Sequence, residues 1–225
     1  MIISAIMNGG LSLTEIIAYV LSAIAVIFLT LPIHEWAHAY TATRLGDPTP
    51  RYDGRLTLNP FAHIDYVGAL GVLLCGIGWA KPVSINTRYF RNPKWDMALT
   101  ALAGPVCNLV VAFIILFIMN TVLFFTEIMG SFVFFVCSFL FYIAQINVGL
   151  AVFNLIPIPP LDGSRLLSAF LPNRLYYKLM RYERVLFYVI LVLVITGVLG
   201  GPIDTATNAI LGVFTNLIEL FFSIF

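Results

Sequence analysis

The chain has 225 residues, of which 60% are hydrophobic and only 10% are charged, and its mean hydropathy is +0.98. Soluble domains usually carry about 25% charged residues, so this composition excludes an ordinary soluble globular protein. The net charge of +1 argues against the concentrated basic surface typical of nucleic-acid-binding domains. Uncharged apolar runs of more than about 18 residues indicate membrane-spanning helices, and the chain is therefore predicted to be an integral membrane protein.

The first uncharged run covers residues 16–33. Ser12 followed by Glu15 has the capping-box spacing that opens a helix, so a spanning helix is predicted over residues 12–44. The run lacks a basic flank and a small-residue cleavage site, which argues against a removable signal peptide. We expect this helix to stay in the mature protein.

The next apolar run, residues 66–80, is short for a hydrocarbon layer about 30 Å thick and contains four glycines, which lower helix propensity. We expect residues 51–80 to form a membrane-associated region, with 66–80 as a re-entrant segment or a short packed helix. Weak alternation before Asn59-Pro60 favours a short strand or hairpin over residues 55–60, and an irregular loop is the alternative. The edge of such a strand can pair with another extended peptide by strand addition.

Longer apolar runs predict core helices within residues 97–163 and a C-terminal helical hairpin over residues 183–225. In that hairpin, residues 185–203 are long enough to span the membrane, whereas Glu219 interrupts the run over 205–225. The predicted fold is an all-α polytopic membrane protein, one membrane-embedded domain with four to six membrane segments over residues 1–225.

Lys and Arg are unevenly distributed among the connections. They gather after the first helix, before residue 97 and between residues 165 and 184, whereas the connections near Glu127 and Asp204 have none. Because positive charge marks cytoplasmic loops, we expect these basic segments in the cytoplasm and the N-terminus outside, in the cell (plasma) membrane.

The first predicted helix carries the motif His34-Glu35-Trp36-Ala37-His38. Residues four apart share a helix face, so both imidazoles can reach one metal ion, and Glu35 can approach a metal-bound water. Such motifs also occur by chance on solvated helix faces, but ionisable side chains in a membrane helix are costly and mark functional sites. The motif therefore predicts a metal site toward the cytoplasmic side of the membrane. Pro32 should weaken the helical turn just before it.

Two histidines leave zinc short of a third protein ligand. Asp162 ends the segment Asn154-Leu-Ile-Pro-Ile-Pro-Pro-Leu-Asp162, in which the prolines break the helix and stiffen the backbone. Broken backbone at membrane depth is tolerated where it is packed or lines a wet cavity, which suits a fixed ligand. Alternatively, Asp162 caps a helix that starts near Ser164. The competing third ligands are His63, Asp53 and Asp65.

Three motifs in this order resemble the site-2 proteases, a family of intramembrane zinc metalloproteases. They are the His34 motif, Ala103-Gly104-Pro105-x-x-Asn108, and Asn154-x-x-Pro157-x-Pro159-x-x-Asp162-Gly163. Two further segments, Gly78-Trp79-Ala80-Lys81-Pro82-Val83 and Leu58-Asn59-Pro60 through Asp65, resemble the small prokaryotic branch without a PDZ domain. The resemblance implies that His34, His38 and Asp162 bind one zinc ion (Zn²⁺), that Glu35 is the general base, and that Asn154 contacts the substrate.

The function that the resemblance implies is hydrolysis of peptide bonds within transmembrane segments, in regulated intramembrane proteolysis or in clearance of membrane-embedded remnants. The implied partners are transmembrane protein substrates and membrane lipid, with no nucleic acid. A metal-binding or metal-transporting membrane protein without protease activity is the alternative, and it would not need Glu35. Two imidazoles and one carboxylate also accept cobalt or iron in place of zinc.

Overall fold

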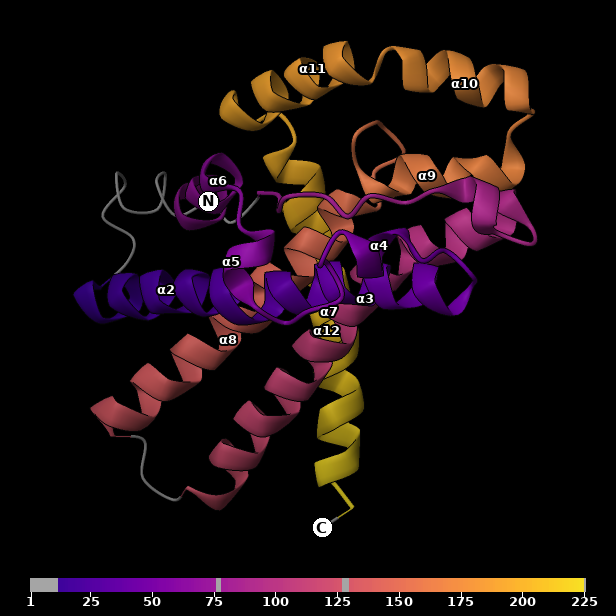
Figure 1. The fold of residues 1–225 in the computed structure, drawn as a ribbon. Coiled ribbons are helices and arrows are strands. Elements are labelled where there is room, and N and C mark those ends of the chain that lie inside the picture. Colours follow the sequence, from indigo (N-terminus) through magenta and orange to yellow (C-terminus); the bar gives the residue numbers. More distant parts are fainter. Residues whose placement is uncertain (1–11, 76–77, 127–129, 225) are drawn as a thin grey trace.

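The computed structural model describes residues 12–75, 78–126 and 130–224 (Figure 1). This part of the chain is built from helices and contains no β-strand, which confirms the predicted all-α fold. Four helices in it are long and apolar enough to cross a membrane: Leu13–Arg44, Pro93–Phe125, Ser131–Asn154 and Gly200–Phe222.

The first long helix has three parts, α2 (Leu13–Ala25), the π-helical η1 (Val26–Thr30) and α3 (Leu31–Arg44). The predicted capping box is present at its start. The Glu15 N–H donates to the Ser12 hydroxyl at 3.3 Å, and the Ser12 N–H donates to the Glu15 carboxylate at 2.8 Å. These two bonds satisfy backbone donors that the first turn of a helix leaves free, and they fix where α2 begins.

The π-helical turn lies just before Pro32, the position at which a weakened turn is predicted. Proline has no amide hydrogen and its ring crowds the preceding turn, so the backbone there departs from regular α-helix. The helix nevertheless continues through Pro32 into the His34 motif. Its inner face packs on α8 through an apolar cluster: Tyr19, Ala23, Val26, Ile27, Leu31, Val72, Ile143, Ile146 and Leu150.

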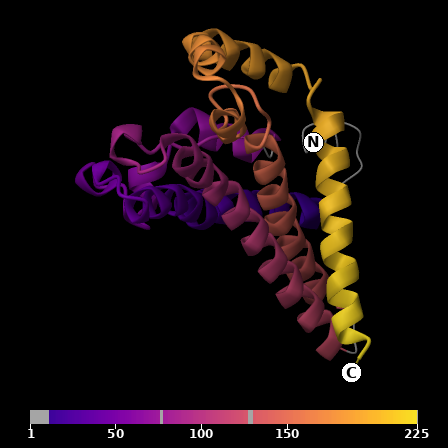
Figure 2. The same cartoon turned by 90° about the vertical axis from the view of Figure 1, so that its right-hand side faces the viewer.

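Three further long helices, α7 (Pro93–Phe125), α8 (Ser131–Asn154) and α12 (Gly200–Phe222), pack against one another. The first long helix runs across them at a steep angle in both views (Figures 1 and 2). Two alanines in the shared core, Ala112 and Ala144, let α7 and α8 approach closely. This core consists of Ala112, Leu116, Ala144, Val148, Leu211 and Ile218.

Short helices connect α3 to α7, namely α4 (Thr49–Tyr52), α5 (Pro60–His63), α6 (Tyr66–Cys75) and the 3₁₀ turn η2 (Thr87–Tyr89). The predicted strand over residues 55–60 is wrong. The Asn59 side chain instead accepts the Phe61 N–H at 3.1 Å and caps α5, with Pro60 as its first residue. Asn at the cap followed by Pro is a regular helix start, and this signal overrides the weak alternation before it.

Helix α6 has 10 residues and is therefore about 15 Å long, too short to cross a hydrocarbon layer. After it the chain returns to its starting point, since the Lys81 N–H donates to the His63 carbonyl at 2.7 Å. A Cβ on Gly78 would overlap the Gly68 carbonyl oxygen, so the two backbones touch. This short packed helix is one of the two predicted forms of residues 66–80, and its entry into the membrane stays a prediction.

The C-terminal part contains α9 (Asp162–Phe170), α10 (Asn173–Arg181) and α11 (Glu183–Ile195) before α12. The prediction that residues 185–203 span the membrane is wrong. Helix α11 ends after 13 residues, and with α10 it arches over the end of the bundle where α9 lies (Figure 1). Gly197 has a φ of +75°, a conformation that ends helices, and the long helix begins only after it.

Candidate active site

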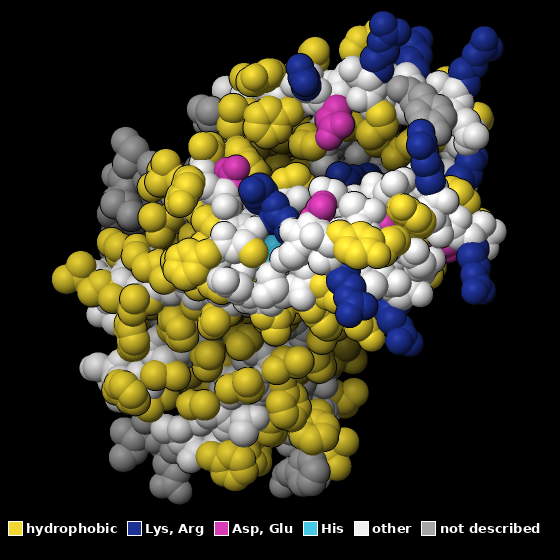
Figure 3. Space-filling model, viewed as in Figure 1, with side chains coloured by type: hydrophobic (Ala, Val, Ile, Leu, Met, Phe, Trp, Pro, Cys, Tyr) yellow, Lys and Arg dark blue, Asp and Glu magenta, His cyan; other side chains and the backbone are white. Residues whose placement is uncertain are grey.

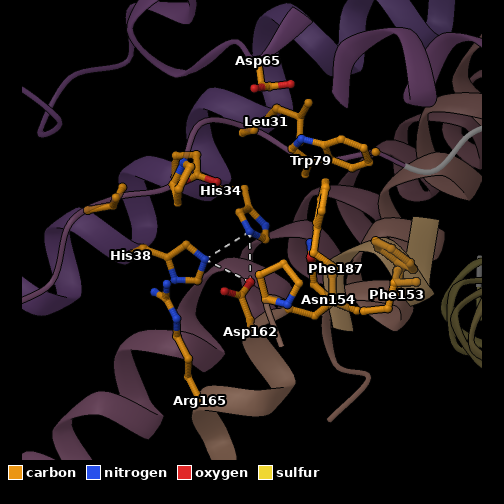
Figure 4. Close-up of a pocket in the computed structure, with 18 of the residues that line it drawn as sticks. Leu31, His34, His38, Asp65, Trp79, Phe153, Asn154, Asp162, Arg165 and Phe187 are labelled. Atoms are coloured by element: carbon orange, nitrogen blue, oxygen red, sulfur yellow. Dashed lines mark hydrogen bonds and ion pairs between the residues drawn. The ribbon is translucent and has the colours of Figure 1, made fainter. Parts of the chain in front are cut away.

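Three side chains from two distant segments converge on one point. His34 and His38 project from α3, and Asp162 is the first residue of α9 (Figure 4). The two Nε2 atoms are 3.1 Å apart, and the Asp162 Oδ2 lies 3.2 Å from Nε2 of His38 and 3.4 Å from Nε2 of His34. Ligand atoms of a tetrahedral zinc site, with bonds of about 2.0–2.1 Å, lie about 3.3–3.4 Å apart. The donor set and its spacing therefore fit a zinc ion.

The protein keeps this cluster away from solvent. His34 is 3% exposed, His38 5% and Glu35 7%. Burial raises the pKa of the Asp162 carboxyl, but the facing imidazoles of His38 and His34 lower it by more, so the net pKa lies well below the usual range. The carboxylate is the form of Asp162 that binds a metal ion.

A backbone contact orients one of the two imidazoles. The His38 Nδ1–H donates to the Thr100 carbonyl oxygen of α7 at 2.7 Å. Because Nδ1 carries the proton, the lone pair of Nε2 is free and points to the other two ligand atoms. The Thr100 hydroxyl in turn donates to the Asp96 carbonyl at 2.7 Å. The Nδ1 of His34 is buried without a hydrogen-bond partner in the described part of the chain, so α7 fixes His38 but not His34 in this way.

Helix α7 passes directly beside the imidazoles at Gly104. A Cβ at this position would overlap Nε2 of His38 and would lie 2.6 Å from Nε2 of His34. Only a glycine lets α7 come this close. Gly104 therefore contributes to the site by having no side chain. In the sequence, the motif Ala103-Gly104-Pro105-x-x-Asn108 is the only signal of this role. Asn108, one turn further on, is buried and its Nδ2 lacks a partner among the described residues.

The backbone around Asp162 explains its orientation. Leu161 is the N-cap of α9 and makes no side-chain cap, and the Asp162 carboxylate points to the imidazoles, so the alternative in which Asp162 caps this helix is not what the structure has. A Cβ on Gly163 would overlap the Leu155 carbonyl oxygen just after the end of α8. Gly163 thus allows the start of α9 to lie against the end of α8, which brings Asp162 to α3.

The competing third ligands lie outside the cluster. His63 is fully buried, and its Nε2 donates to the Thr57 carbonyl at 2.8 Å. Asp53 is exposed at the end of α4. Asp65 accepts the Gly68 N–H at 2.8 Å. Within the described residues, the group whose ligand atoms gather for a metal ion consists of His34, His38 and Asp162.

Comparison with known proteins now identifies the family. The chain matches the model of Peptidase family M50, the site-2 protease family, over residues 22–197, a range that includes all three metal-site side chains. The chain belongs to Peptidase family M50. The predicted resemblance is confirmed, and the family assignment makes the chain a metalloprotease.

This M50 peptidase is 36% identical over 210 residues to YwhC of Bacillus subtilis (strain 168), covering 89% of this chain and 96% of that protein. It is 32% identical over 178 residues to Rip2 of Mycolicibacterium smegmatis, covering 76% of this chain and 66% of that protein. It is 30% identical over 179 residues to Rip2 of Mycobacterium tuberculosis (strain H37Rv), covering 77% of this chain and 66% of that protein. All three carry provisional names as zinc metalloproteases. No solved structure matches the chain.

The metal-site side chains of the peptidase face a pocket of about 280 Å³. Glu35 and Asn154 line it, so both predicted functional residues lie beside the three side chains that could hold a metal ion. Its opposite wall is apolar and combines the extended residues 78–85 with α11. Trp79 and Phe187 join these two parts through an edge-to-face contact with ring centroids 5.5 Å apart (Figure 4). The sequence analysis missed this wall, because its residues are apolar and carry no motif.

Proposed function

We propose that this M50 peptidase hydrolyses peptide bonds within membrane-spanning segments of other proteins. The observation that supports this most is the convergence of two imidazoles and one carboxylate, with Glu35, in a buried pocket among helices apolar enough to cross a membrane. Ionisable groups are expensive in such a setting and are kept there for function. The substrates are transmembrane proteins, cleaved for signalling or for the removal of membrane-embedded remnants.

Five polar residues of the pocket have a role in this proposal. His34, His38 and Asp162 hold one zinc ion, which when bound supplies a Lewis acid for the scissile carbonyl and lowers the pKa of water. Glu35 takes a proton from the attacking water on its carboxylate and passes it to the leaving amide nitrogen. The Asn154 side-chain amide donates a hydrogen bond to the substrate backbone and positions it.

The substrate must unwind locally, since a helical peptide bond has its carbonyl oxygen occupied by a helix hydrogen bond. Residues 55–58, the predicted edge for strand addition, form no strand. The extended residues 79–85 line the pocket instead, and the described structure has no backbone hydrogen bond for Val83 or Ile85. We assign strand addition to this segment, because Val83 and Ile85 line the pocket and have no backbone hydrogen bond within the described residues.

The orientation belongs to the same proposal. On the face shown in Figure 3, Lys and Arg gather over α9 to α11 and the neighbouring loops, while the part built from the long helices is hydrophobic. With basic segments in the cytoplasm, four spanning helices put both chain ends outside, in contact with lipid along the apolar surface. Reporter fusions at residues 1 and 225 test this, and a cytoplasmic signal from either end contradicts it.

The deciding experiment measures zinc content and cleavage of a transmembrane model substrate in detergent. Glu35→Gln should keep about one zinc per chain and lose cleavage by about 10²–10⁴-fold, because general acid–base catalysis typically contributes that factor. Asp162→Ala should lose zinc. A Glu35→Gln protein that binds zinc and cuts like the native chain contradicts the proposal and favours the alternative, a metal-binding or metal-transporting protein.

A further inference from the structure

We infer that Arg165 is a carboxylate-binding residue that receives the new C-terminus formed when this peptidase cuts its substrate. The inference rests on the proposed function. Arg165 is a cation beside the metal site, and neither metal binding nor general base catalysis explains why it is there.

Arg165 lies between two cavities. It is in α9 three residues after Asp162, so both side chains project from one helix face. Figure 4 shows it reaching from α9 toward His38, beside Asp162. Arg165 lines the metal-site pocket and also a second cavity of about 350 Å³, which Ser84, Ser164, Tyr176 and Glu183 line as well. The two cavities are therefore neighbours, and Arg165 is the cation among the described residues that they share.

This guanidinium has no counter-ion in the described part of the chain. The ion pairs there are those of Asp162 with His34 and His38, and Arg165 makes neither an ion pair nor a hydrogen bond. Asp162, the nearest acid in sequence, directs its carboxylate at the imidazoles instead. A partly buried, unpaired cation beside an apolar wall is unfavourable, and an anion that enters the pocket removes this cost.

The reaction produces such an anion in this pocket. Hydrolysis adds water across the peptide bond, and at neutral pH an uncharged carbonyl becomes a carboxylate while the amide nitrogen becomes a protonated amine. Of the described side chains that line the pocket, Arg165 is the cation outside the ligand set, whereas Glu35 and Asp65 repel a carboxylate. The planar guanidinium fork matches a carboxylate with two parallel hydrogen bonds.

The second cavity gives the bound carboxylate a way out. At about 350 Å³ it has room for several water molecules, each of which takes about 30 Å³ in the liquid. The hydroxyl groups of Ser84 and Ser164 and the water that fills this cavity surround a departing charge better than the apolar wall of α11 does, whereas Glu183 repels it and keeps it from binding there. Arg165 thus draws the new C-terminus from the metal-site side toward this cavity.

The test compares two forms of one hydrophobic peptide, ending in a free carboxylate or in a carboxamide. Binding of both is measured in detergent to zinc-loaded Glu35→Gln protein, which does not consume peptide. With Arg165 present, the acid should bind about tenfold or more tightly than the amide, since charge-assisted hydrogen bonds contribute at this level. Zinc also favours the acid, but equally in every variant that retains zinc.

The decisive quantity is the change in the acid-to-amide ratio. Arg165→Gln should lower it about tenfold without changing amide binding or zinc content, and Arg165→Lys should fall between because it keeps charge but not the fork. Arg184→Gln is the matched control, since Arg184 is exposed and lines neither cavity, and it should leave the ratio unchanged.

An Arg165→Gln protein that keeps the ratio, or that weakens both peptides equally, overturns the inference. Cleavage by the otherwise native chain is measured in the same preparation. If the native chain cuts a transmembrane substrate but the ratio does not respond to Arg165, only the carboxylate assignment fails. If the native chain does not cut, the proposed function fails, whatever the peptides show.

Discussion

The two walls of the metal-site pocket are built in different ways. On one wall His34, His38 and Asp162 hold their ligand atoms within 3.4 Å of one another, and Gly104 touches the imidazoles. The other wall consists of the extended residues 78–85 and α11, which meet through apolar contacts such as that of Trp79 with Phe187. The first wall depends on exact atomic positions, and the second depends on hydrophobic surface.

This difference follows from what each wall has to do. Metal ligation tolerates displacements of only a few tenths of an ångström, so its supports are backbone contacts and missing side chains. A covering wall has to exclude water and admit a peptide, and many apolar side chains serve that purpose. Substitutions in the first wall should therefore act on metal binding, and those in the second on substrate binding.

The largest effect is expected for Gly104→Ala. The added methyl group occupies the space of the His38 and His34 Nε2 atoms, so either α7 or the imidazoles must move. We expect zinc affinity to fall by about 10–100-fold or more, the range seen when supports of metal ligands are lost, with cleavage falling in parallel. Zinc competition titrations measure this.

Gly212→Ala is the matched control for that substitution. Gly212 lies in α12, and a Cβ there meets nothing within 4 Å. It should leave zinc affinity unchanged and slightly favour the helix, since alanine is the better helix former. Equal zinc affinities for Gly104→Ala and the native chain would mean that the wall with the metal-site side chains tolerates substitutions as well as the apolar wall does.

A smaller effect of another kind is expected for Phe187→Ala. It removes the ring that packs on Trp79 and keeps His34, His38 and Asp162, so zinc content should stay at the native level. Cleavage should fall several-fold, about 3–10-fold, mainly through a higher KM, because a buried aromatic contact contributes about 1 kcal/mol or more. Steady-state kinetics with parallel zinc analysis measure both quantities.

Val192→Ala serves as the control on the same helix, because Val192 is 57% exposed and does not line the pocket. It should behave like the native chain in zinc content and KM. Loss of zinc from Phe187→Ala would contradict the distinction between the two walls, because it would show that the apolar wall also holds the metal-site side chains in position.

The metal wall was predictable from sequence because chemistry restricts its residue types and spacing. A helix places His34 and His38 on one face whatever surrounds them. The proline-broken segment made Asp162 a candidate third ligand beside His63, Asp53 and Asp65, and the family resemblance singled it out. The start of α2 was predictable for the same local reason, since Ser12 and Glu15 satisfy each other within one turn.

Features that depend on contacts between distant segments could not be derived in this way. The apolar run over residues 185–203 fits a spanning helix and a covering helix equally well, and the φ of Gly197 ends α11 only in the folded chain. The roles of Gly104 and Arg165 come from what α7 and α9 bring beside them. The missed start of α5 was different, because Asn59-Pro60 carried a helix-cap signal that was interpreted as a turn.

The smallest effect is expected inside the metal wall itself, at Thr100→Val. The group that accepts the His38 Nδ1–H is the Thr100 carbonyl oxygen, which the substitution keeps. The hydroxyl donates only to the Asp96 carbonyl one turn earlier, and valine has nearly the same shape. Zinc affinity should therefore change by no more than about twofold, well within the scatter of mild substitutions. A tenfold loss in the same titration would show that the metal wall depends on side-chain bonds beyond its ligands, and the backbone contact of α7 would then be insufficient to hold His38.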